Sequence, residues 1–323
     1  MRILVTGGTG FIGSHLIRRL ISEKHRVSVL SRPDSDNWRI KDISKQIQTI
    51  DYYSVDQLNN AFKKNKFDLI IHLASLYIKN TDIPGDINNL NEANIMTPSL
   101  LLQIAVNHKV AGFINTGSCF EYFPLKRPVQ ETDLIRPFNY YAATKIAFEQ
   151  ILKYFVNNKE IRGVTLKLFY PYGPRDNVKV IPLMIDSLMN NKSLTLTYGE
   201  QKLNFTFVED IVDAYIKAAD YIASARYKKY EVFNIGTDKK ISVKKIGRIL
   251  QKISGKRDKL SFSRPYPENE IMDLSCSYEK AERVLHWSPA TDIIGGLEET
   301  YNLSLIHISE PTRLRRISYA VFC

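Results

Sequence analysis

The sequence has little cysteine and no long apolar run. Its three cysteines, Cys119, Cys276 and Cys323, are scattered and odd in number, so they provide neither a disulfide framework nor a metal-binding cluster. We therefore expect no metal site and a reducing, cytoplasmic location. No apolar stretch approaches the ~18 residues that a membrane span requires, and we expect no signal peptide because the first strand pattern begins at residue 3. These absences predict a globular protein without a membrane partner.

Positive charge is in excess, with a formal net charge of +11 at pH 7, but it is not concentrated in one motif. The lysines are spread along predicted helices, as at Lys63, Lys64, Lys244 and Lys245, without interleaved aromatic residues. This spread is typical of a solvated surface and predicts no nucleic-acid partner. A positive field would still attract a substrate that carries a diphosphate.

The first fifteen residues, MRILVTGGTGFIGSH, combine an apolar strand, a glycine-rich turn and the start of an amphipathic helix. Gly7, Gly10 and Gly13 lie three residues apart, and Phe11 and Ile12 begin the apolar face of the helix. Such a turn lets the backbone approach an anion, to which the helix N-terminus offers unpaired N–H groups. An ordinary strand–helix turn is the alternative, but the context favours a dinucleotide pyrophosphate site. The lack of a Lys-Ser or Lys-Thr pair after the last glycine argues against a Walker-type loop.

Strand and helix patterns alternate along the first half of the chain, which predicts an α/β fold with a Rossmann-type, doubly wound parallel sheet. Strands are expected at Ile3–Val5, Val27–Leu30, Ile47–Ile50, Leu69–His72, Gly112–Asn115, Thr165–Phe169, Leu194–Thr197 and Val232–Ile235, and helices at Val55–Lys64, Ala93–Asn107, Tyr141–Phe155 and Val208–Ala223. Residues 1–170 are predicted to form the dinucleotide-binding domain. Residues 171–303 are predicted to form mainly a smaller C-terminal substrate-binding lobe, some segments of which return to the sheet. Residues 304–323 break the helical pattern and are expected to be a non-native or disordered tail.

A tyrosine and a lysine are spaced to share one face of a helix. Tyr141 and Lys145 stand at positions i and i+4 of the predicted helix, one turn apart. An ammonium group beside a phenol favours the phenolate, and lowering the pKa of Tyr141 by about three units would require roughly 4 kcal/mol. The alternative is an ordinary amphipathic helix, in which the same spacing arises by chance.

A serine follows the apolar strand Phe113-Ile-Asn-Thr-Gly-Ser118. Ser118 lies just beyond the apolar run, where a parallel sheet presents catalytic groups. Its hydroxyl is placed to hydrogen-bond the oxygen of a carbonyl or alcohol substrate and to orient it toward Tyr141. A plain turn serine is the alternative interpretation.

With these motifs in order, the chain resembles the extended short-chain dehydrogenases/reductases of the NAD-dependent epimerase/dehydratase family, which act on nucleotide sugars. The resemblance covers about residues 1–303 and includes Pro171-Tyr-Gly-Pro174, Phe205-x-Phe-Val-x-Asp210, Asn234-Ile-Gly236 and Leu285-His-Trp287. It implies that Ser118, Tyr141 and Lys145 are catalytic. It implies that the cofactor contacts Gly7, Gly10, Phe11, Ile12, Gly13, Asp51, Tyr52, Leu73, Ala74, Ser75, Asn94, Tyr141, Lys145, Tyr170 and Pro171. It also implies a homodimer formed through the helices at Ala93–Asn107 and Tyr141–Phe155.

The residues after the second strand, Ser31 and Arg32, bear on the choice of cofactor. Members that select NAD carry an acidic residue at this place, which binds the ribose 2′-hydroxyl. A guanidinium instead suits a 2′-phosphate, so we predict NADP(H), with Arg32 as a ligand. NAD(H) is the alternative, with Asp34 supplying the acid and Arg32 lying on the surface.

The residues that follow Ser118 bear on the reaction. The 4,6-dehydratases of the family carry an Asp-Glu pair there, whereas this chain has Cys119 and Phe120, which argues against dehydration. Glu121 is one place further, where strand alternation would turn it differently. Cys119 is an acid/base thiol or, more simply, a small buried hydrophobe.

The second lobe resembles reductases of 4-keto-deoxyhexoses in Tyr172-Gly-Pro-Arg-Asp-Asn177, Gly199-Glu-Gln201 and Arg264-Pro-Tyr-Pro-Glu-Asn-Glu270. The resemblance implies substrate contacts from Ser118, Cys119, Tyr172, Asn177, Lys202 and Arg264, with Arg264 on the diphosphate. The Arg-Asp that the family carries before Phe205 is replaced by Leu203-Asn204. This departure leaves open whether Lys202 takes over the phosphate contact, and whether the substrate carries a nucleotide at all.

Reduction of a 4-keto (deoxy)hexose nucleotide by NADPH, with Tyr141 as proton donor, is therefore the expected function. A 4-epimerase that holds NAD is one alternative, because the same residues can remove and return a hydride at C4. A dinucleotide-binding module that senses redox state or scaffolds partners is an alternative of another class.

Overall fold

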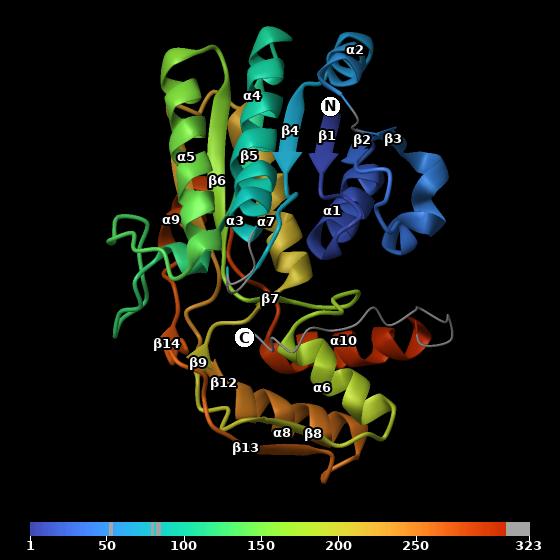
Figure 1. Ribbon diagram of the computed structural model, residues 1–323, viewed down its shortest axis with the longest axis vertical. Coiled ribbons are helices and arrows are strands. Elements are labelled where there is room, and N and C mark those ends of the chain that lie inside the picture. The colour runs from blue at the N-terminus through green and yellow to red at the C-terminus, as the bar shows by residue number, and fades with distance from the viewer. Residues whose placement is uncertain (52–53, 79–80, 82–84, 308–323) are drawn as a thin grey trace.

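The computed structural model describes residues 1–51, 54–78, 81 and 85–307. Seven parallel strands form its central sheet, in the order β11-β6-β5-β4-β1-β2-β3 (Figure 1). The strands are β1 (Arg2–Thr6), β2 (Arg26–Ser31), β3 (Gln48–Asp51), β4 (Leu69–His72), β5 (Gly112–Ser118), β6 (Arg162–Leu168) and β11 (Glu231–Ile235). Strand order reverses between β1 and β4, which is where a doubly wound sheet binds its ligand. The predicted fold class is confirmed.

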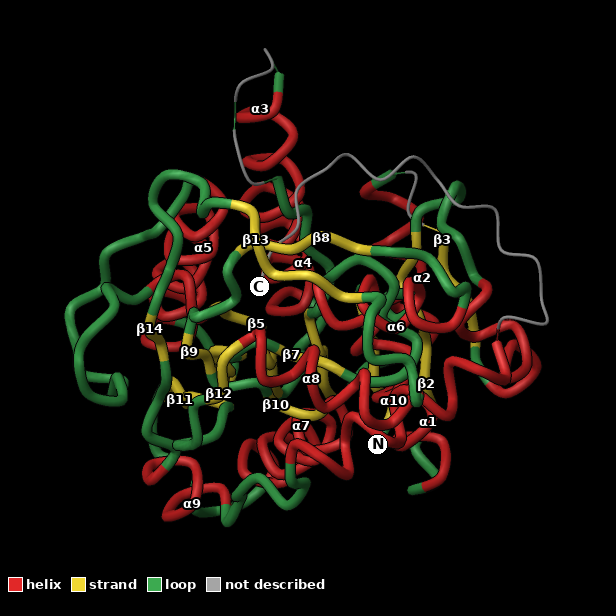
Figure 2. The backbone as a smooth tube through the Cα atoms, turned by 90° about the horizontal axis from the view of Figure 1, so that it is seen from below, coloured by secondary structure: helices red, strands yellow, loops and turns green. Residues whose placement is uncertain are grey.

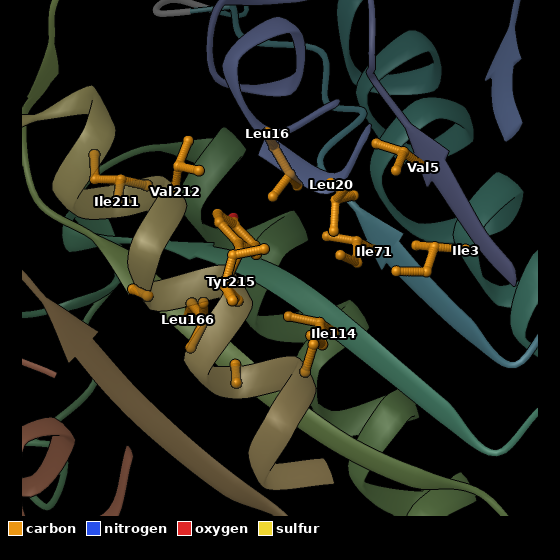
Figure 3. Close-up of a cluster of buried hydrophobic side chains, with 14 of the residues drawn as sticks. Ile3, Val5, Leu16, Leu20, Ile71, Ile114, Leu166, Ile211, Val212 and Tyr215 are labelled. Carbon is orange, nitrogen blue, oxygen red and sulfur yellow. The ribbon is translucent and has the colours of Figure 1, made fainter. Parts of the chain in front are cut away.

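Helices cover both faces of this sheet. One face packs against α1 (Phe11–Ser22), α7 (Val208–Ala223) and α9 (Glu279–Leu285), and the other against α2 (Val55–Asn65), α4 (Thr97–Asn107) and α5 (Tyr140–Asn158). Side chains of a strand alternate between these cores. Ile3 and Val5 therefore pack with Leu16 of α1 and Tyr215 of α7 (Figure 3), whereas Leu4 enters the opposite core. Burial on both faces explains why the strands read as continuous apolar runs.

A smaller lobe lies beyond the carboxyl ends of the sheet strands (Figure 1). Its elements are β7 (Pro171–Tyr172), α6 (Val180–Met189), β8 (Leu194–Thr197), β9 (Lys202–Leu203), β10 (Thr206–Phe207), β12 (Ile241–Ser242), α8 (Val243–Ser254), β13 (Leu260–Arg264), β14 (Asp273–Leu274) and α10 (Ile293–His307). These elements share a separate apolar core, and β8 and β13 run parallel along its outer side (Figure 2). The chain returns to the main sheet at β11. Helix α10 continues through residues 304–307, and the rest of the expected tail lies outside the described residues.

One expected helix is divided. In place of a single helix over Ala93–Asn107, the chain forms α3 (Asp86–Asn91), a π-helical turn (Glu92–Met96) and then α4. Pro98 is the physical reason, because it has no N–H to donate to the carbonyl of Asn94 and its ring would clash there. The widened turn is common at functional sites.

The two lobes are joined beside the glycine turn. His15 of α1 contacts Glu209 Oε1 of α7 through Nδ1 (2.6 Å) and the carbonyl of Pro174 through Nε2 (2.9 Å). Arg39, in a 3₁₀ segment (Trp38–Gln46), donates to Asn177 Oδ1 (2.7 Å) and to the carbonyl of Arg175 (2.9 Å). These contacts hold the first loop of the second lobe against the dinucleotide-binding half.

Candidate active site

The glycine turn between β1 and α1 forms a cradle for an anion. Gly7 has a left-handed φ of +68°, and a Cβ there would lie 2.6 Å from the backbone nitrogen of Ala74. A Cβ on Gly13 would collide with the carbonyl oxygen of Gly7. Gly10 is the N-cap of α1, which receives no side-chain cap and has no acidic residue in its first turn. No side chain therefore caps the first N–H groups of α1, including those of Phe11 and Ile12. These N–H groups can instead donate hydrogen bonds to a pyrophosphate.

The loop after β4 is fastened to the end of β1. The Leu73 N–H donates to the carbonyl of Thr6 (3.2 Å), and the Ala74 N–H donates to the Thr6 hydroxyl (3.2 Å). That hydroxyl also contacts Nδ1 of His72 (2.8 Å). Burial lowers the pKa of His72 to about 3, so its imidazole is neutral at physiological pH. The predicted cofactor residues Leu73 and Ala74 therefore lie directly beside Gly7.

Asn94, in the π-helical turn, connects this loop to α5. Its buried amide accepts from the Leu76 N–H (2.8 Å) and the Ser75 hydroxyl (3.2 Å). The same amide donates to the carbonyl of Leu76 (2.9 Å) and to the Thr144 hydroxyl (3.0 Å). Asn94 thus acts as a clamp between Ser75 and the helix that carries Tyr141 and Lys145.

Tyr141 lies in the first turn of α5, behind the N-cap Asn139. Its ring packs edge-on against Tyr77, with centroids 4.9 Å apart, and its hydroxyl hydrogen-bonds with Ser75. Burial raises the pKa of Tyr141 above its usual 10, and the bond with Ser75 opposes only part of that shift. The expected lowering of this pKa is therefore wrong in this structure, because removing the phenol from water favours its neutral form.

Lys145 is buried one turn further along α5. Burial lowers the pKa of its ammonium group from 10.5 to about 8, and the carboxylate of Glu121 opposes this shift. At a pH slightly above the physiological value, Lys145 is therefore present in both its charged and its neutral form.

Ser118 ends β5 and caps a short 3₁₀ turn (Cys119–Glu121). Its hydroxyl oxygen accepts from the Phe120 N–H (3.2 Å), while its own N–H donates to Glu121 Oε1 (2.6 Å). Because its oxygen already accepts one bond, the hydroxyl is set to donate its proton to another group. Burial raises the pKa of Cys119 to about 12, so this residue is a buried thiol and not a base.

The residues expected to contact the adenosine part of the cofactor lie at the carboxyl ends of two adjacent strands, β2 and β3. Ser31 of β2 pairs with Asp51 of β3 in the sheet register. Arg32 follows directly, with 78% of its side chain exposed and its Nε 3.8 Å from Asp34 Oδ1. Both side chains of this ion pair are largely exposed, so a ligand at the end of β2 could contact Arg32. The predicted contact Tyr52 lies outside the described residues.

The turn from β6 to the second lobe corrects one expectation. Tyr170 adopts a left-handed φ of +37° and packs against Phe120, with Pro171 following it. Tyr172, expected at the substrate, is instead a core residue, because its ring is buried and its hydroxyl lies against Gly296 of α10. Asn177 is exposed, and its side-chain oxygen accepts from Arg39.

The two basic residues expected at the substrate lie in the second lobe. Lys202 is exposed in β9, whose backbone pairs with β12 and β14. Arg264 is exposed at the end of β13, opposite Thr197 of β8. The backbone of each residue pairs only with strands of its own lobe in the described part of the chain.

Several charged residues near the site were not predicted. The Lys179 ammonium lies 5.7 Å from the centroid of the Phe11 ring and donates to the carbonyl of Pro171 (3.0 Å). A second group lies behind Ser118, where Glu121, Lys167 and Glu149 form a buried ion cluster. In the sequence, the one feature that could have indicated this cluster is a lysine, Lys167, within the apolar stretch Val164–Leu168.

Other features of the described residues lie away from this site. A cavity of about 750 Å³, lined by Leu69, Ala111 and Arg162 among others, opens at the amino ends of the strands, the edge opposite Ser118. Among the described residues, no three His, Cys, Asp or Glu side chains are grouped to hold a metal ion. In the same part of the chain, no helix has the length and apolar character needed to cross a membrane.

Comparisons with known proteins agree with this geometry. The model of the NAD dependent epimerase/dehydratase family matches residues 3–236. A CDP-abequose synthase of Salmonella typhimurium is 30% identical over 311 residues, covering 92% of this chain and 96% of that protein. A putative UDP-glucose 4-epimerase of Methanocaldococcus jannaschii is 28% identical, covering 93% and 97%. The structure of a UDP-glucuronic acid 4-epimerase from Bacillus cereus, with UDP-glucuronic acid and NAD, superposes with a TM-score of 0.84 at 27% identity, covering 95% of this chain and all of that one.

Proposed function

This chain belongs to the NAD dependent epimerase/dehydratase family, and on that premise we propose that it reduces the 4-keto group of a nucleotide-linked deoxyhexose with hydride from NADPH. The observation that carries this choice is the placement of Tyr141, whose hydroxyl bonds to Ser75 in the loop beside the glycine turn. Burial favours its neutral phenol, which can give a proton at once but cannot accept one. Reduction of a ketone needs a proton donor, whereas oxidation of an alcohol, the first step of epimerisation, needs a base.

The residues divide the reaction between them. The glycine turn and the N-terminus of α1 would hold the dinucleotide, and its reduced nicotinamide would supply the hydride for C4 of the sugar. Ser118, with its oxygen occupied by the Phe120 N–H, donates its hydroxyl proton in a hydrogen bond to the C4 oxygen. Tyr141 gives that oxygen a proton as its negative charge develops, and the Lys145 ammonium stabilises the phenolate that remains. Cys119 and Phe120 offer no acid–base pair for dehydration.

Turnover of reduced cofactor tests the proposed reaction directly. The protein is incubated with NADPH and a panel of 4-keto-6-deoxy sugar nucleotides, and the absorbance of the reduced nicotinamide is followed. We expect the absorbance to fall with formation of a 4-hydroxy sugar. Inversion of a 4-hydroxy sugar nucleotide without added cofactor and without any loss of NADPH would instead support a 4-epimerase, the activity for which two of the compared proteins are named.

The preference for NADPH over NADH rests on Arg32. Its exposed guanidinium follows β2 and can pair with a 2′-phosphate, whereas Asp34 and Asp51 are the nearby acids that would suit a ribose hydroxyl. Arg32→Ala should weaken NADPH binding by about tenfold or more and leave NADH binding nearly unchanged. Asp34→Ala is the matched control and should not weaken NADPH binding. Tighter binding of NADH than of NADPH by the unmodified protein would contradict the preference.

The proposed active unit is a homodimer formed through α4 and α5. Met96, in the π-helical turn before α4, and Tyr154, on α5, expose 59% and 57% of their surfaces. A helical interface on this face would bury both of them.

A further inference from the structure

Three charged side chains are buried together behind Ser118. Lys167 Nζ lies 3.0 Å from Glu121 Oε2 and 3.5 Å from Glu149 Oε2, and it also lies 4.7 Å from the centroid of the Tyr122 ring. The exposed fractions of the three charged side chains are 1% for Lys167, 0% for Glu121 and 5% for Glu149. Each comes from a different element: β6, the turn after β5, and α5.

Such a cluster is not explained by stability. Moving ions out of water is costly, and apolar residues of similar size often stabilise a fold as well or better. Although burial opposes it, the carboxylates of Glu121 and Glu149 raise the pKa of Lys167, so the lysine keeps its charge. Burial raises the pKa of Glu149. Both carboxylates thus share one buried cation.

Glu121 connects the cluster to the catalytic residues in two ways. Its Oε1 accepts the N–H of Ser118 at 2.6 Å, which completes the capping box that orients the serine hydroxyl. Its charge is also the one that acts on the buried ammonium of Lys145. Glu149, the far end of the cluster, stands one helical turn beyond Lys145 on α5.

We propose that Glu121 is a positioning residue for the reaction: one of its carboxylate oxygens holds the Ser118 turn, the other is anchored by Lys167 of β6, and its negative charge acts on Lys145. This role rests on the proposed function, in which those three residues act on the substrate. The carboxylate uses both oxygens, one for Ser118 and one for Lys167. A glutamine at this position has one oxygen and cannot serve both.

The test compares Glu121→Gln with Glu149→Gln. Both variants remove one acidic partner of the same buried Lys167, but only Glu121 contacts Ser118. We expect Glu121→Gln to lower kcat by about tenfold or more, because Ser118 loses its alignment, while KM for the cofactor changes little. Glu149→Gln should retain most of the activity. Equal losses in the two variants, or full activity of Glu121→Gln, would show that the cluster is only structural.

The pH profile gives a second readout that a purely structural role would not move. Removing the charge of Glu121 lowers the pKa of Lys145 further, so the basic limb of kcat/KM should move to lower pH in Glu121→Gln and stay in place in Glu149→Gln. The titratable groups that face Glu121 are Lys167, Lys145, Glu149, Tyr141, Cys119, Tyr122 and Tyr230. An unmoved limb in Glu121→Gln would overturn the proposal.

Two further measurements keep the test decisive. If Glu121→Gln does not fold, the double variant Glu121→Gln/Lys167→Gln also removes the buried lysine charge that has lost its partner. This double variant should show the same loss of kcat and the same shift of the basic limb of kcat/KM. A kcat and a pH profile like those of the wild-type protein would overturn the proposal. The pH dependence of NADPH binding, measured by fluorescence without any sugar, should shift in the same direction. If the wild-type protein binds NADPH but reduces no sugar nucleotide, the proposed function fails, while this binding shift still decides the role of Glu121.

Discussion

At Tyr141, a single hydroxyl oxygen is expected to deliver the proton of the reaction. Tyr141→Phe keeps the ring that packs against Tyr77, so the fold and dinucleotide binding should be preserved. We expect kcat to fall by about 10²–10⁴-fold, the usual contribution of a positioned general acid. Tyr140→Phe is the matched control, because it removes a neighbouring hydroxyl that bonds to Asn91 outside the site. Full turnover by Tyr141→Phe would contradict proton donation by this residue.

Lys145 sets the expected pH dependence. Its ammonium group stabilises the phenolate, and burial lowers the pKa of that ammonium to about 8. The charged form predominates below this pH and is lost as pH rises through it. We therefore expect kcat/KM, which reports the free enzyme, to decline as pH rises above about 8, well below the usual lysine value of 10.5. A profile that stays level up to pH 10 would show that Lys145 is not required in its charged form.

The spacing of Tyr141 and Lys145 in the sequence identified them as catalytic candidates, but it did not predict the directions in which their pKa values shift. The four-residue interval on a helix places Tyr141 and Lys145 on one face whatever else the chain does. The direction of each pKa shift depends on burial by segments far away in sequence, and a one-dimensional pattern does not contain that information. Tyr172 illustrates the same limit, since only the packing of α10 against its hydroxyl assigns this residue to the core.

At the scale of elements, the π-helical turn is the feature that holds the site together. Asn94→Ala removes an amide that makes four hydrogen bonds to Ser75, Leu76 and Thr144. Because it leaves buried polar groups unpaired, we expect the free energy of unfolding to fall by about 1–3 kcal/mol, with weaker NADPH binding. Chemical denaturation measures the first effect and fluorescence titration the second. Asn91→Ala, which removes one half-buried bond to Tyr140, should change both much less; equal effects would argue against a clamp.

The elements differ in how far sequence patterns could define them. Leu69–His72, Leu194–Thr197 and Val208–Ala223 match β4, β8 and α7 to the residue, because apolar periodicity and turn residues delimit them. The single helix expected over Ala93–Asn107 was wrong, although Pro98 marked the place. The buried cluster of Glu121, Lys167 and Glu149 could not be predicted from periodicity, since it joins three elements across the core.

At the scale of the whole molecule, the proposed assembly is a homodimer formed through α4 and α5. Tyr154→Glu places a charge on the exposed face of α5, so we expect it to convert a dimer into a monomer. Sedimentation equilibrium measures the change. Tyr198→Glu, an equally drastic change on the second lobe, should leave the dimer intact. A monomeric wild-type protein at micromolar concentration would contradict the expectation.

The junction of the two lobes relates the fold to function. His15, Arg39 and Asn177 hold the loop that follows β7 against α1, so the second lobe is fixed over the glycine turn. The alternation of strands and helices predicted the doubly wound parallel sheet. It did not predict these polar contacts, which join residues more than a hundred positions apart.

Transfer of deuterium from NADPH labelled at the reactive C4 position of the nicotinamide tests the central claim most directly. Product isolated from a 4-keto-6-deoxy sugar nucleotide is examined by NMR for the position of the label. The account predicts deuterium on C4 of the sugar, and transfer that nearly disappears in Tyr141→Phe. A product without deuterium at that carbon, or label transfer undiminished in Tyr141→Phe, would contradict it.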